Sequence, residues 1–289
     1  MEIEKYPYFV EVDINQRPIL HPRFQALTDG ISEFTFANLF LFRQKHNYRL
    51  SWLSEDILLI SGKDENETFF MLPFGLPDKN ILTELFMQLG AMKTVPEKHI
   101  SILSKMGYSV FEDRDNFDYI YSREDLANLQ GRKFHKKKNL LNLFEKKNQC
   151  QAKPLLEEYR NDAIEVLELW RKQQANEGDY AAAREALENM WTLQLCGGIF
   201  YINKKPVAYN LGEELGTKSH FAILFEKALS HEDYKGIYQF INQNFASILP
   251  EKYTTINREQ DLGVPGLRQA KESYNPVGFV KKYKVRVPS

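Results

Sequence analysis

The stretch IFYINKKPVAYNLGEELGTKSHFAILF, residues 199–225, decides how the second half of this chain folds. Three runs rich in apolar residues can be distinguished within it, Ile199–Ile202, Pro206–Glu213 and Ser219–Phe225. Polar turns separate these runs at 203–205 and 216–218. Short apolar runs bounded by turn residues are typical of strands, and loops this short connect antiparallel neighbours. The stretch therefore predicts a three-stranded antiparallel meander.

Helices flank this meander on both sides. Two helical stretches precede it, at about Leu156–Gln174 and Ala181–Leu195. After it, Lys235–Leu249 places its apolar residues on one face of a helix, and Tyr253–Asn257 predicts a further strand. A strand that returns after a helical crossover pairs in parallel, so the predicted sheet is mixed.

The first half of the chain repeats this order of elements. Its meander is predicted from strands at Tyr48–Trp52, Ile57–Ser61 and Thr68–Leu72. These are followed by a helix from Asp78 to Gly90, a helix at Glu97–Met106 and a strand at Tyr108–Glu112. The order resembles that of the GNAT acyltransferase fold. We therefore expect an α/β protein with mixed sheets, built from two tandem GNAT acyltransferase-like halves at residues 1–135 and 136–289. A generic α+β protein with the same element order is the alternative.

Composition narrows the class of protein. The chain has 289 residues and a net charge of −1, so no overall basic field attracts nucleic acid. Apolar runs such as Ile57–Ile60 are far shorter than the ~20 residues of a membrane span, and the N-terminus does not resemble a signal peptide. Cys150 and Cys196 form no CxxC or Cys/His motif, so we expect neither a disulfide nor a metal site. These features predict a cytoplasmic protein.

The segment 256–276 contains the densest group of candidate site residues. A strand predicted to end at Asn257 is followed by Arg258 and Asp261. Pro265 suits the first position of a short helix, and the adjacent helix N-terminus predicts an anion or carboxylate site. Arg268 can bind such a group in a bidentate way. The alternative is a surface helix whose charges are solvated.

Charged residues on the predicted central strands are the other candidates. A glutamate there can act as a general base if burial raises its pKa. The predicted catalytic residues are Glu213 and Asp261. The predicted substrate-binding residues are Asn257, Arg258, Arg268, Lys271, Tyr274 and His220. Residues of these kinds on strands more commonly face solvent, which is the competing interpretation.

A family resemblance rests on three segments. Gly266-Leu267-Arg268, with Lys271, Tyr274 and Pro276, resembles the signature near the end of the phosphatidylglycerol lysyltransferase C-terminal domain family. Here two residues, rather than one, separate Lys271 from Tyr274. This chain also resembles the stand-alone bacterial members of the family in two further segments. These are Ser32–Leu39 with Arg43 and Tyr48, and Asp118–Tyr121 followed by His135–Asn139.

The resemblance implies a tandem GNAT-like fold related to Fem-type aminoacyltransferases. Such enzymes move an amino acid from aminoacyl-tRNA to a lipid or to a peptidoglycan precursor. The membrane lysyltransferases carry a large transmembrane region ahead of this domain, and this sequence shows none. We therefore expect the acceptor to be a lipid reached by peripheral contact with the membrane, a peptidoglycan precursor, or a small amine or hydroxyl compound.

A basic stretch near the middle of the chain is a candidate surface for tRNA. The residues expected to contact phosphates are Arg132, Lys133, Lys136 and Lys137. The interleaved Phe134 and His135 could stack on a base. The alternative is a solvated face of an amphipathic helix.

The loop ahead of the predicted helix at 235 argues against acyl-CoA as the donor. A pyrophosphate is usually bound by the backbone of a glycine-rich loop at a helix N-terminus. The segment His231–Tyr238 offers one glycine, Gly236, and the carboxylates of Glu232 and Asp233 would repel the ligand. We therefore expect an aminoacyltransferase without a cofactor. An N-acetyltransferase that uses acetyl-CoA and a non-catalytic protein that binds a ligand or RNA are the alternatives.

Overall fold

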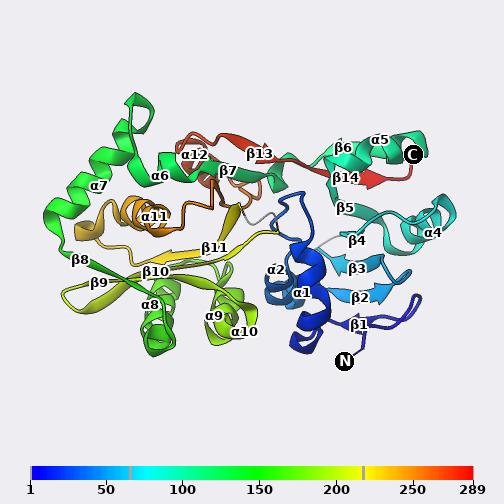
Figure 1. Cartoon of the computed structure of the whole chain (residues 1–289), viewed down its shortest axis with the longest axis horizontal. Helices are drawn as coiled ribbons and strands as arrows, with labels where there is room; N and C mark the ends of the chain where they lie inside the picture. The colour runs from blue at the N-terminus through cyan, green and yellow to red at the C-terminus, as the bar shows by residue number, and fades with distance from the viewer. Residues whose placement is uncertain (1, 65–66, 217–218, 289) are drawn as a thin grey trace. The chain divides into compact units, whose positions relative to one another are not determined.

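The structure is a computed structural model that describes residues 2–64, 67–216 and 219–288 (Figure 1). Thr217 and Lys218, part of an expected turn, lie outside these residues. The chain forms two units. Unit 1 comprises Met1–Asp118, Gln260–Val264 and Phe279–Ser289, and unit 2 comprises Tyr119–Glu259 and Pro265–Gly278.

Unit 1 contains helices, a meander, a crossover helix and further strands. Its helices are η1 (Ile14–Gln16), α1 (Arg17–Gln25), α2 (Phe36–Leu41), α3 (Arg43–His46), α4 (Lys79–Leu89), η2 (Glu97–His99), α5 (Ile100–Lys105) and η3 (Arg114–Asn116). Its strands are β1 (Val10–Glu11), β2 (Arg49–Trp52), β3 (Leu58–Lys63), β4 (Thr68–Met71), β5 (Ala91–Pro96), β6 (Ser109–Glu112) and β14 (Lys282–Arg286). The sheet order is β1-β2-β3-β4-β5-β14-β6, with β4 and β5 parallel.

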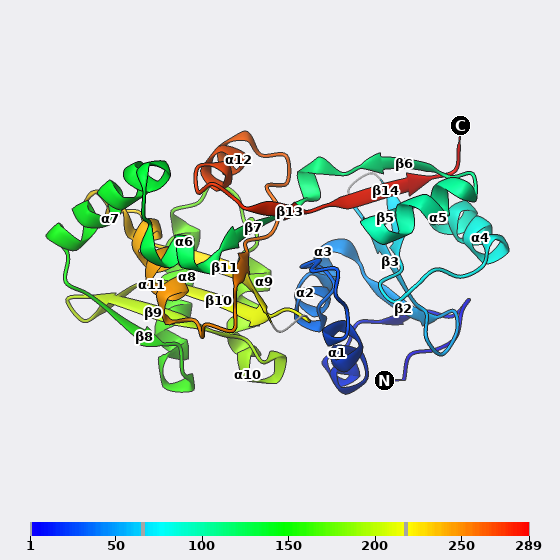
Figure 2. The same ribbon diagram turned by 45° about the horizontal axis from the view of Figure 1, so that its top comes forward.

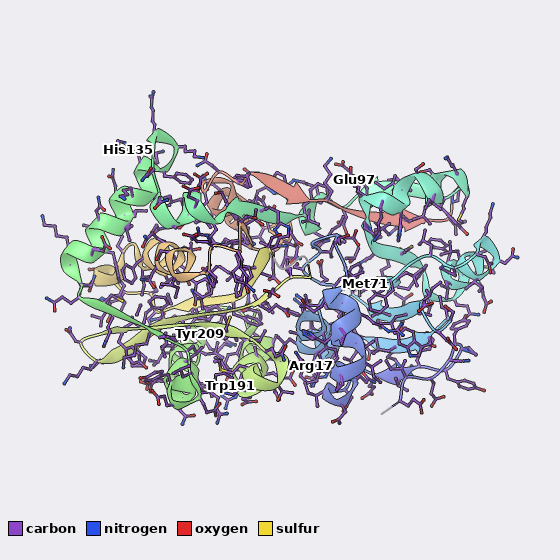
Figure 3. The ribbon with its side chains drawn as sticks, viewed as in Figure 1. Arg17, Met71, Glu97, His135, Trp191 and Tyr209 are labelled. Atoms are coloured by element: carbon purple, nitrogen blue, oxygen red, sulfur yellow. The ribbon has the colours of Figure 1, made fainter. Side chains whose placement is uncertain are left out.

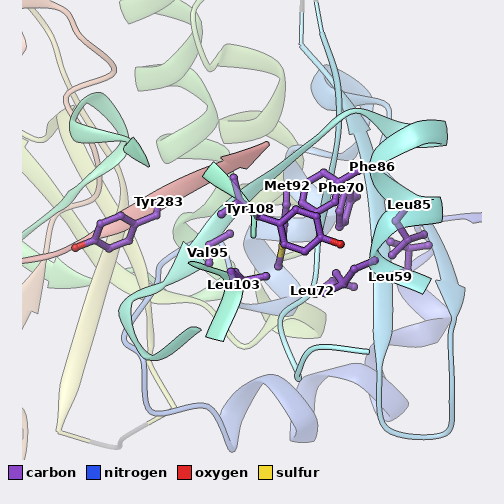
Figure 4. Packing of buried hydrophobic residues seen from close by; sticks show 12 residues of the cluster. Leu59, Phe70, Leu72, Leu85, Phe86, Met92, Val95, Leu103, Tyr108 and Tyr283 are labelled. Carbon is purple, nitrogen blue, oxygen red and sulfur yellow. The ribbon is translucent and has the colours of Figure 1, made fainter. Parts of the chain in front are cut away.

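Aliphatic and aromatic side chains together fill the core between this sheet and α4 (Figure 4). The Asp78 carboxylate caps α4 by accepting hydrogen bonds from two backbone N–H groups. Phe86 of α4 packs against Phe70 of β4 at 5.2 Å between ring centroids and against Tyr108 at 4.7 Å. Tyr283 of β14 belongs to the same cluster, so the C-terminal strand contributes to the core of the first unit.

Unit 2 repeats the order of unit 1. Its helices are α6 (Arg123–Asn128), η4 (Arg132–Phe134), α7 (His135–Lys147), η5 (Glu157–Tyr159), α8 (Arg160–Lys172), α9 (Tyr180–Glu188), α10 (Met190–Leu193), η6 (Glu232–Tyr234), α11 (Ile237–Ile248) and α12 (Pro265–Glu272). The strands of its sheet are β7 (Asp118–Ser122), β8 (Cys150–Pro154), β9 (Cys196–Ile202), β10 (Lys205–Glu214), β11 (His220–Ala228), β12 (Thr255–Asn257) and β13 (Gly278–Val280). The sheet order is β13-β7-β12-β11-β10-β9-β8, with β11 and β12 parallel. In Figure 1, α11 and α8 lie on opposite faces of this sheet.

Each sheet contains a strand from the other half of the sequence. β14, drawn in red in Figures 1 and 2, pairs antiparallel with both β5 and β6. β7 pairs antiparallel with β12. The two sheets share one strand order when the first is read from β1 and the second from β8. In each sheet the sixth strand, β14 or β7, comes from elsewhere in the chain. The expected boundary at residue 135 lies inside unit 2, because β7 and α6 join that unit although they precede the boundary. The predicted α/β fold class, with two tandem halves and mixed sheets, is confirmed.

Buried charges hold the start of β14 in unit 1. Lys282 is fully buried, and its ammonium bonds to Asp118 at 2.7 Å and to Glu33. Asp118 also accepts hydrogen bonds from Ser32, through the backbone N–H and the hydroxyl, both at 2.9 Å. Gln260 donates to Asp118 at 2.8 Å. Segments from distant parts of the sequence therefore meet at one buried cation.

The charge state of Glu33 should make the stability of unit 1 depend on pH. Burial raises the pKa of Glu33, and this effect outweighs the opposing attraction of Lys282. A carboxyl whose pKa is raised on folding loses stability as the pH rises through that pKa. We therefore expect Glu33→Gln to gain unfolding free energy relative to wild type between pH 5 and pH 8, measured by urea titration. The opposite trend would show that Lys282 dominates the pKa of Glu33.

Candidate functional site

The polar segment that follows β12 begins where two parallel strands part. β12 pairs with β11 only as far as Ala222 and Asn257, whereas β11 continues beside β10 to Ala228. The Asn257 Oδ1 atom accepts a hydrogen bond from the Glu259 N–H at 2.8 Å, and Glu259 has a φ of 53°. Asparagine side chains commonly form such turns. Arg258 therefore leaves the sheet next to a part of β11 that β12 does not cover.

Arg258 forms an ion pair with Glu226 of β11. Their side chains are only 13% and 12% exposed. The Arg258 guanidinium carbon lies 5.2 Å from the ring centroid of Tyr274 and 5.8 Å from that of Tyr121, within range of a cation–π interaction. Burial acts to lower the pKa of Arg258, but the Glu226 carboxylate and the tyrosines outweigh it and raise the pKa. Arg258 is thus a fixed, largely buried cation.

Helix α12 brings two residues of the predicted motif to this ion pair. The Lys271 ammonium donates to the backbone carbonyl of Arg258. The Lys271 carbonyl accepts a hydrogen bond from the Tyr121 hydroxyl at 2.8 Å. Tyr274 is buried, and its hydroxyl accepts a hydrogen bond from Gln239 at 3.2 Å. The motif therefore places a lysine and a tyrosine around Arg258.

A residue of α7 completes the group. The Lys137 ammonium lies 4.1 Å from the ring centroid of Tyr274. Its side chain is half-buried, and burial, with a smaller contribution from Arg258, lowers the pKa of Lys137. We call the following six residues the Arg258 cluster: Tyr121, Lys137, Glu226, Arg258, Lys271 and Tyr274. Four of the six, Lys137, Arg258, Lys271 and Tyr274, are predicted site residues. All six residues lie within unit 2.

The other predicted residues lie elsewhere. Asp261 belongs to unit 1, where it accepts a hydrogen bond from Arg114 at 3.1 Å and another from the Gly263 N–H at 2.9 Å. These contacts are those of a carboxylate that holds a loop. Glu213 is buried on β10 opposite Ala222. The catalytic roles of Glu213 and Asp261 remain predictions.

His220 and Arg268 are not among the six residues that define the Arg258 cluster. His220 is the first residue of β11, where its ring contacts the Thr255 hydroxyl. Burial lowers the pKa of His220. Arg268 is half-buried on α12. Their predicted roles in substrate binding, like that of Asn257 in the turn, remain predictions.

The basic stretch divides into an exposed and a buried face. Arg132 and Lys136 are exposed, and Lys133 pairs with Asp125 at 2.7 Å. His135, labelled in Figure 3, is exposed at the start of α7. Phe134, in contrast, is fully buried in a core cluster. The prediction that Phe134 stacks on a base is therefore wrong, because that ring packs inside unit 2.

Sequence reasoning missed Glu226 and Gln239. Glu226 follows the apolar run Phe221–Phe225, and a carboxylate at such a position on a buried strand requires a partner. The carboxylate directly after that apolar run was the available signal. Gln239 is one of several polar residues on α11, and the sequence gives no reason to single it out.

Comparisons with known proteins identify the family of the chain. The family model for the C-terminal part of phosphatidylglycerol lysyltransferase matches residues 24–286. The chain belongs to this family. The resemblance predicted from the Gly266–Pro276 motif is confirmed. No curated protein matches the chain.

Solved structures extend the similarity. A conserved protein of unknown function from Bacteroides thetaiotaomicron is 30% identical, with a TM-score of 0.85 over 97% of this chain and 99% of that one. L-PGS from Bacillus licheniformis is 14% identical, with a TM-score of 0.64 over 100% of this chain and 95% of that one. FemX is 9% identical, with a TM-score of 0.58 over 96% of both. The last two similarities show a shared fold. Within the described part of the chain, no helix is long and apolar enough to cross a membrane.

Proposed function

We propose that this protein moves an aminoacyl group from aminoacyl-tRNA to a lipid, a peptidoglycan precursor or a small amine or hydroxyl acceptor. Membership of the phosphatidylglycerol lysyltransferase family over residues 24–286 carries this proposal. The fold shared with L-PGS and FemX supports it. The Arg258 cluster is the site we assign to the reaction.

The chemistry requires one nucleophile and one fixed positive group. The acceptor nitrogen or oxygen attacks the carbonyl carbon of the aminoacyl ester, and the bond from that carbon to the ribose oxygen breaks. The proton lost by the acceptor ends on the ribose hydroxyl of the tRNA. The Lys271 ammonium, held by the Arg258 carbonyl, supplies a preorganised donor to the oxyanion of the tetrahedral intermediate.

Glu226 can accept the proton of the attacking group. One carboxylate oxygen, Oε2, pairs with Arg258. The other, Oε1, is buried and has no hydrogen-bond partner among the described residues. An acceptor hydroxyl or amine at this oxygen would satisfy it, and a carboxylate in hydrogen-bond reach can act as a general base. We therefore assign this role to Glu226 in the proposed reaction.

The loop before α11 supports a donor other than acyl-CoA. Its one glycine, Gly236, has a φ of 100° and forms the N-cap of α11. A Cβ atom there would lie 2.2 Å from the Leu140 carbonyl oxygen, so close packing against α7 requires this glycine. The segment His231–Tyr238 contains no second glycine. It therefore lacks the glycine-rich backbone on which a pyrophosphate usually binds.

Lys271→Met tests the proposed function. We expect aminoacyl transfer by the variant to fall by about a hundredfold, because one fixed donor to the oxyanion is lost. The measurement is transfer of labelled amino acid from aminoacyl-tRNA to lipid vesicles, peptidoglycan precursors and small amines. Lys105→Met, at an exposed position on α5, is the control and should retain wild-type turnover. Absence of transfer by the wild-type protein to every acceptor, or turnover by the Lys271 variant within twofold of wild type, would refute the assignment.

A further inference from the structure

Within the described part of the chain, the Lys137 ammonium is a partly buried cation without an anionic partner. Among the residues that the structure describes, its recorded contact is the Tyr274 ring, and it has no hydrogen-bond acceptor or ion pair. Lys133, also on the basic stretch, pairs with Asp125, and Lys138 donates to the Asn128 carbonyl at 3.3 Å. Removing an ammonium from water without an acceptor costs free energy. Lys137 is thus unlike its neighbours.

Nearby charge increases this cost. Arg258 lies against the same Tyr274 ring, at 5.2 Å from its centroid, and lowers the pKa of Lys137. The Glu226 carboxylate pairs with Arg258, so its charge is already matched. The positive charge of Lys137 therefore remains uncompensated inside the cluster. An anion that bound there would restore the balance.

Tyr274 provides a second unused donor. Its hydroxyl oxygen accepts a hydrogen bond from Gln239, which leaves the hydroxyl proton free to be donated. Tyr274 is 5% exposed, and no acceptor for this proton is recorded among the described residues. A buried donor without an acceptor is costly. The ammonium and this hydroxyl together offer several donors to one ligand.

We propose that Lys137 and Tyr274 bind a phosphate group, with Arg258 as the neighbouring cation. A phosphate has enough acceptor oxygens to serve both the ammonium and the hydroxyl, and positive side chains are its usual ligands. This inference adds a phosphate site to the proposed function. The role of that phosphate in the reaction rests on the proposed function. The phosphate can belong to a lipid headgroup, to tRNA or to a small soluble molecule.

Binding of inorganic phosphate to the full-length protein tests this site. Line broadening in ³¹P NMR and isothermal titration calorimetry measure the affinity. We expect Lys137→Met and Tyr274→Phe each to weaken binding by about tenfold, which corresponds to about 1.4 kcal/mol. Lys137→Arg keeps the charge and should retain binding. Lys138→Met, one residue away and exposed, is the matched control and should bind like wild type.

Competition identifies the source of the phosphate. Displacement of inorganic phosphate by phosphatidylglycerol vesicles, but not by phosphatidylcholine vesicles, would assign the site to an anionic headgroup. Displacement by uncharged tRNA would assign it to the donor, and displacement by neither would assign it to a small soluble ligand. The proposal is overturned if wild type does not bind phosphate, or if Lys137→Met and Tyr274→Phe bind it like wild type. Suppose that wild type binds phosphate and both variants lose this binding, but wild type transfers no aminoacyl group to any acceptor. That result would refute the proposed function and still support the phosphate site.

Discussion

Replacing Arg258 by methionine should lower the free energy of unfolding by about 3 kcal/mol, because the Glu226 carboxylate would lose its partner in a largely buried position. For a protein of this size, that loss corresponds to a fall in the thermal midpoint of about 6–12 °C. The cation–π contacts with Tyr121 and Tyr274 would be lost as well. Calorimetry on the purified variant measures the shift.

A second substitution separates the charge effect from the loss of packing. Arg258→Met combined with Glu226→Gln leaves no unpaired carboxylate, so most of the lost stability should return. Glu226→Gln alone provides the fourth corner of the double-mutant cycle. If the double variant were as unstable as Arg258→Met, the guanidinium would stabilise unit 2 through its ring contacts rather than through its charge.

The order of the elements could be predicted from sequence because it depends on local patterns. Apolar runs separated by short turns correspond to β9, β10 and β11, and the apolar face of Lys235–Leu249 corresponds to α11. The repeated order gave the fold class for the same reason. Each of these features is visible within a window of about 10–20 residues.

Strand pairing between distant segments could not be predicted in this way. In β14, Tyr283 and Val285 alternate with basic residues as in a strand, but its partners β5 and β6 lie much earlier in the sequence. In β5, the polar pair Lys93 and Thr94 interrupts the run of apolar residues that would predict a strand. The structure gives Thr94 a φ of 55°, which is outside the range of a regular strand. The exchanged strands therefore escaped prediction, and so did the way the chain divides into units.

The candidate site shows the same division between local and distant information. The motif from Gly266 to Tyr274 could be recognised, and the structure brings Lys271 and Tyr274 to Arg258. Glu226 was missed because its partner follows a helix and a further strand. Lys137 was assigned to a tRNA surface from its neighbours in sequence, whereas its ammonium lies against Tyr274. Charge runs reveal which side chains are basic but not which of them turn inward.

Removing the buried cation of unit 1 should have a larger effect on stability than any change on the surface. Lys282→Met would leave Asp118, which is fully buried, and Glu33, which is 18% exposed at its side chain, without their shared cation. Breaking a buried ion pair in this way costs about 3–5 kcal/mol. A fall in the thermal midpoint of about 6–20 °C follows, measured by calorimetry at pH 7.

The neighbouring lysine is a matched control. Lys281 is 43% exposed at its side chain and pairs with Glu112 on the surface, so Lys281→Met should change the midpoint by about 2 °C or less. The deficit of Lys282→Met should shrink as the pH falls, because the pKa of Glu33 is already raised by burial and would rise further without the cation. Protonation would then remove one of the unpaired charges. Equal shifts for the two lysine variants, or a deficit that grew at low pH, would show that Lys282 does not hold β14 through its charge.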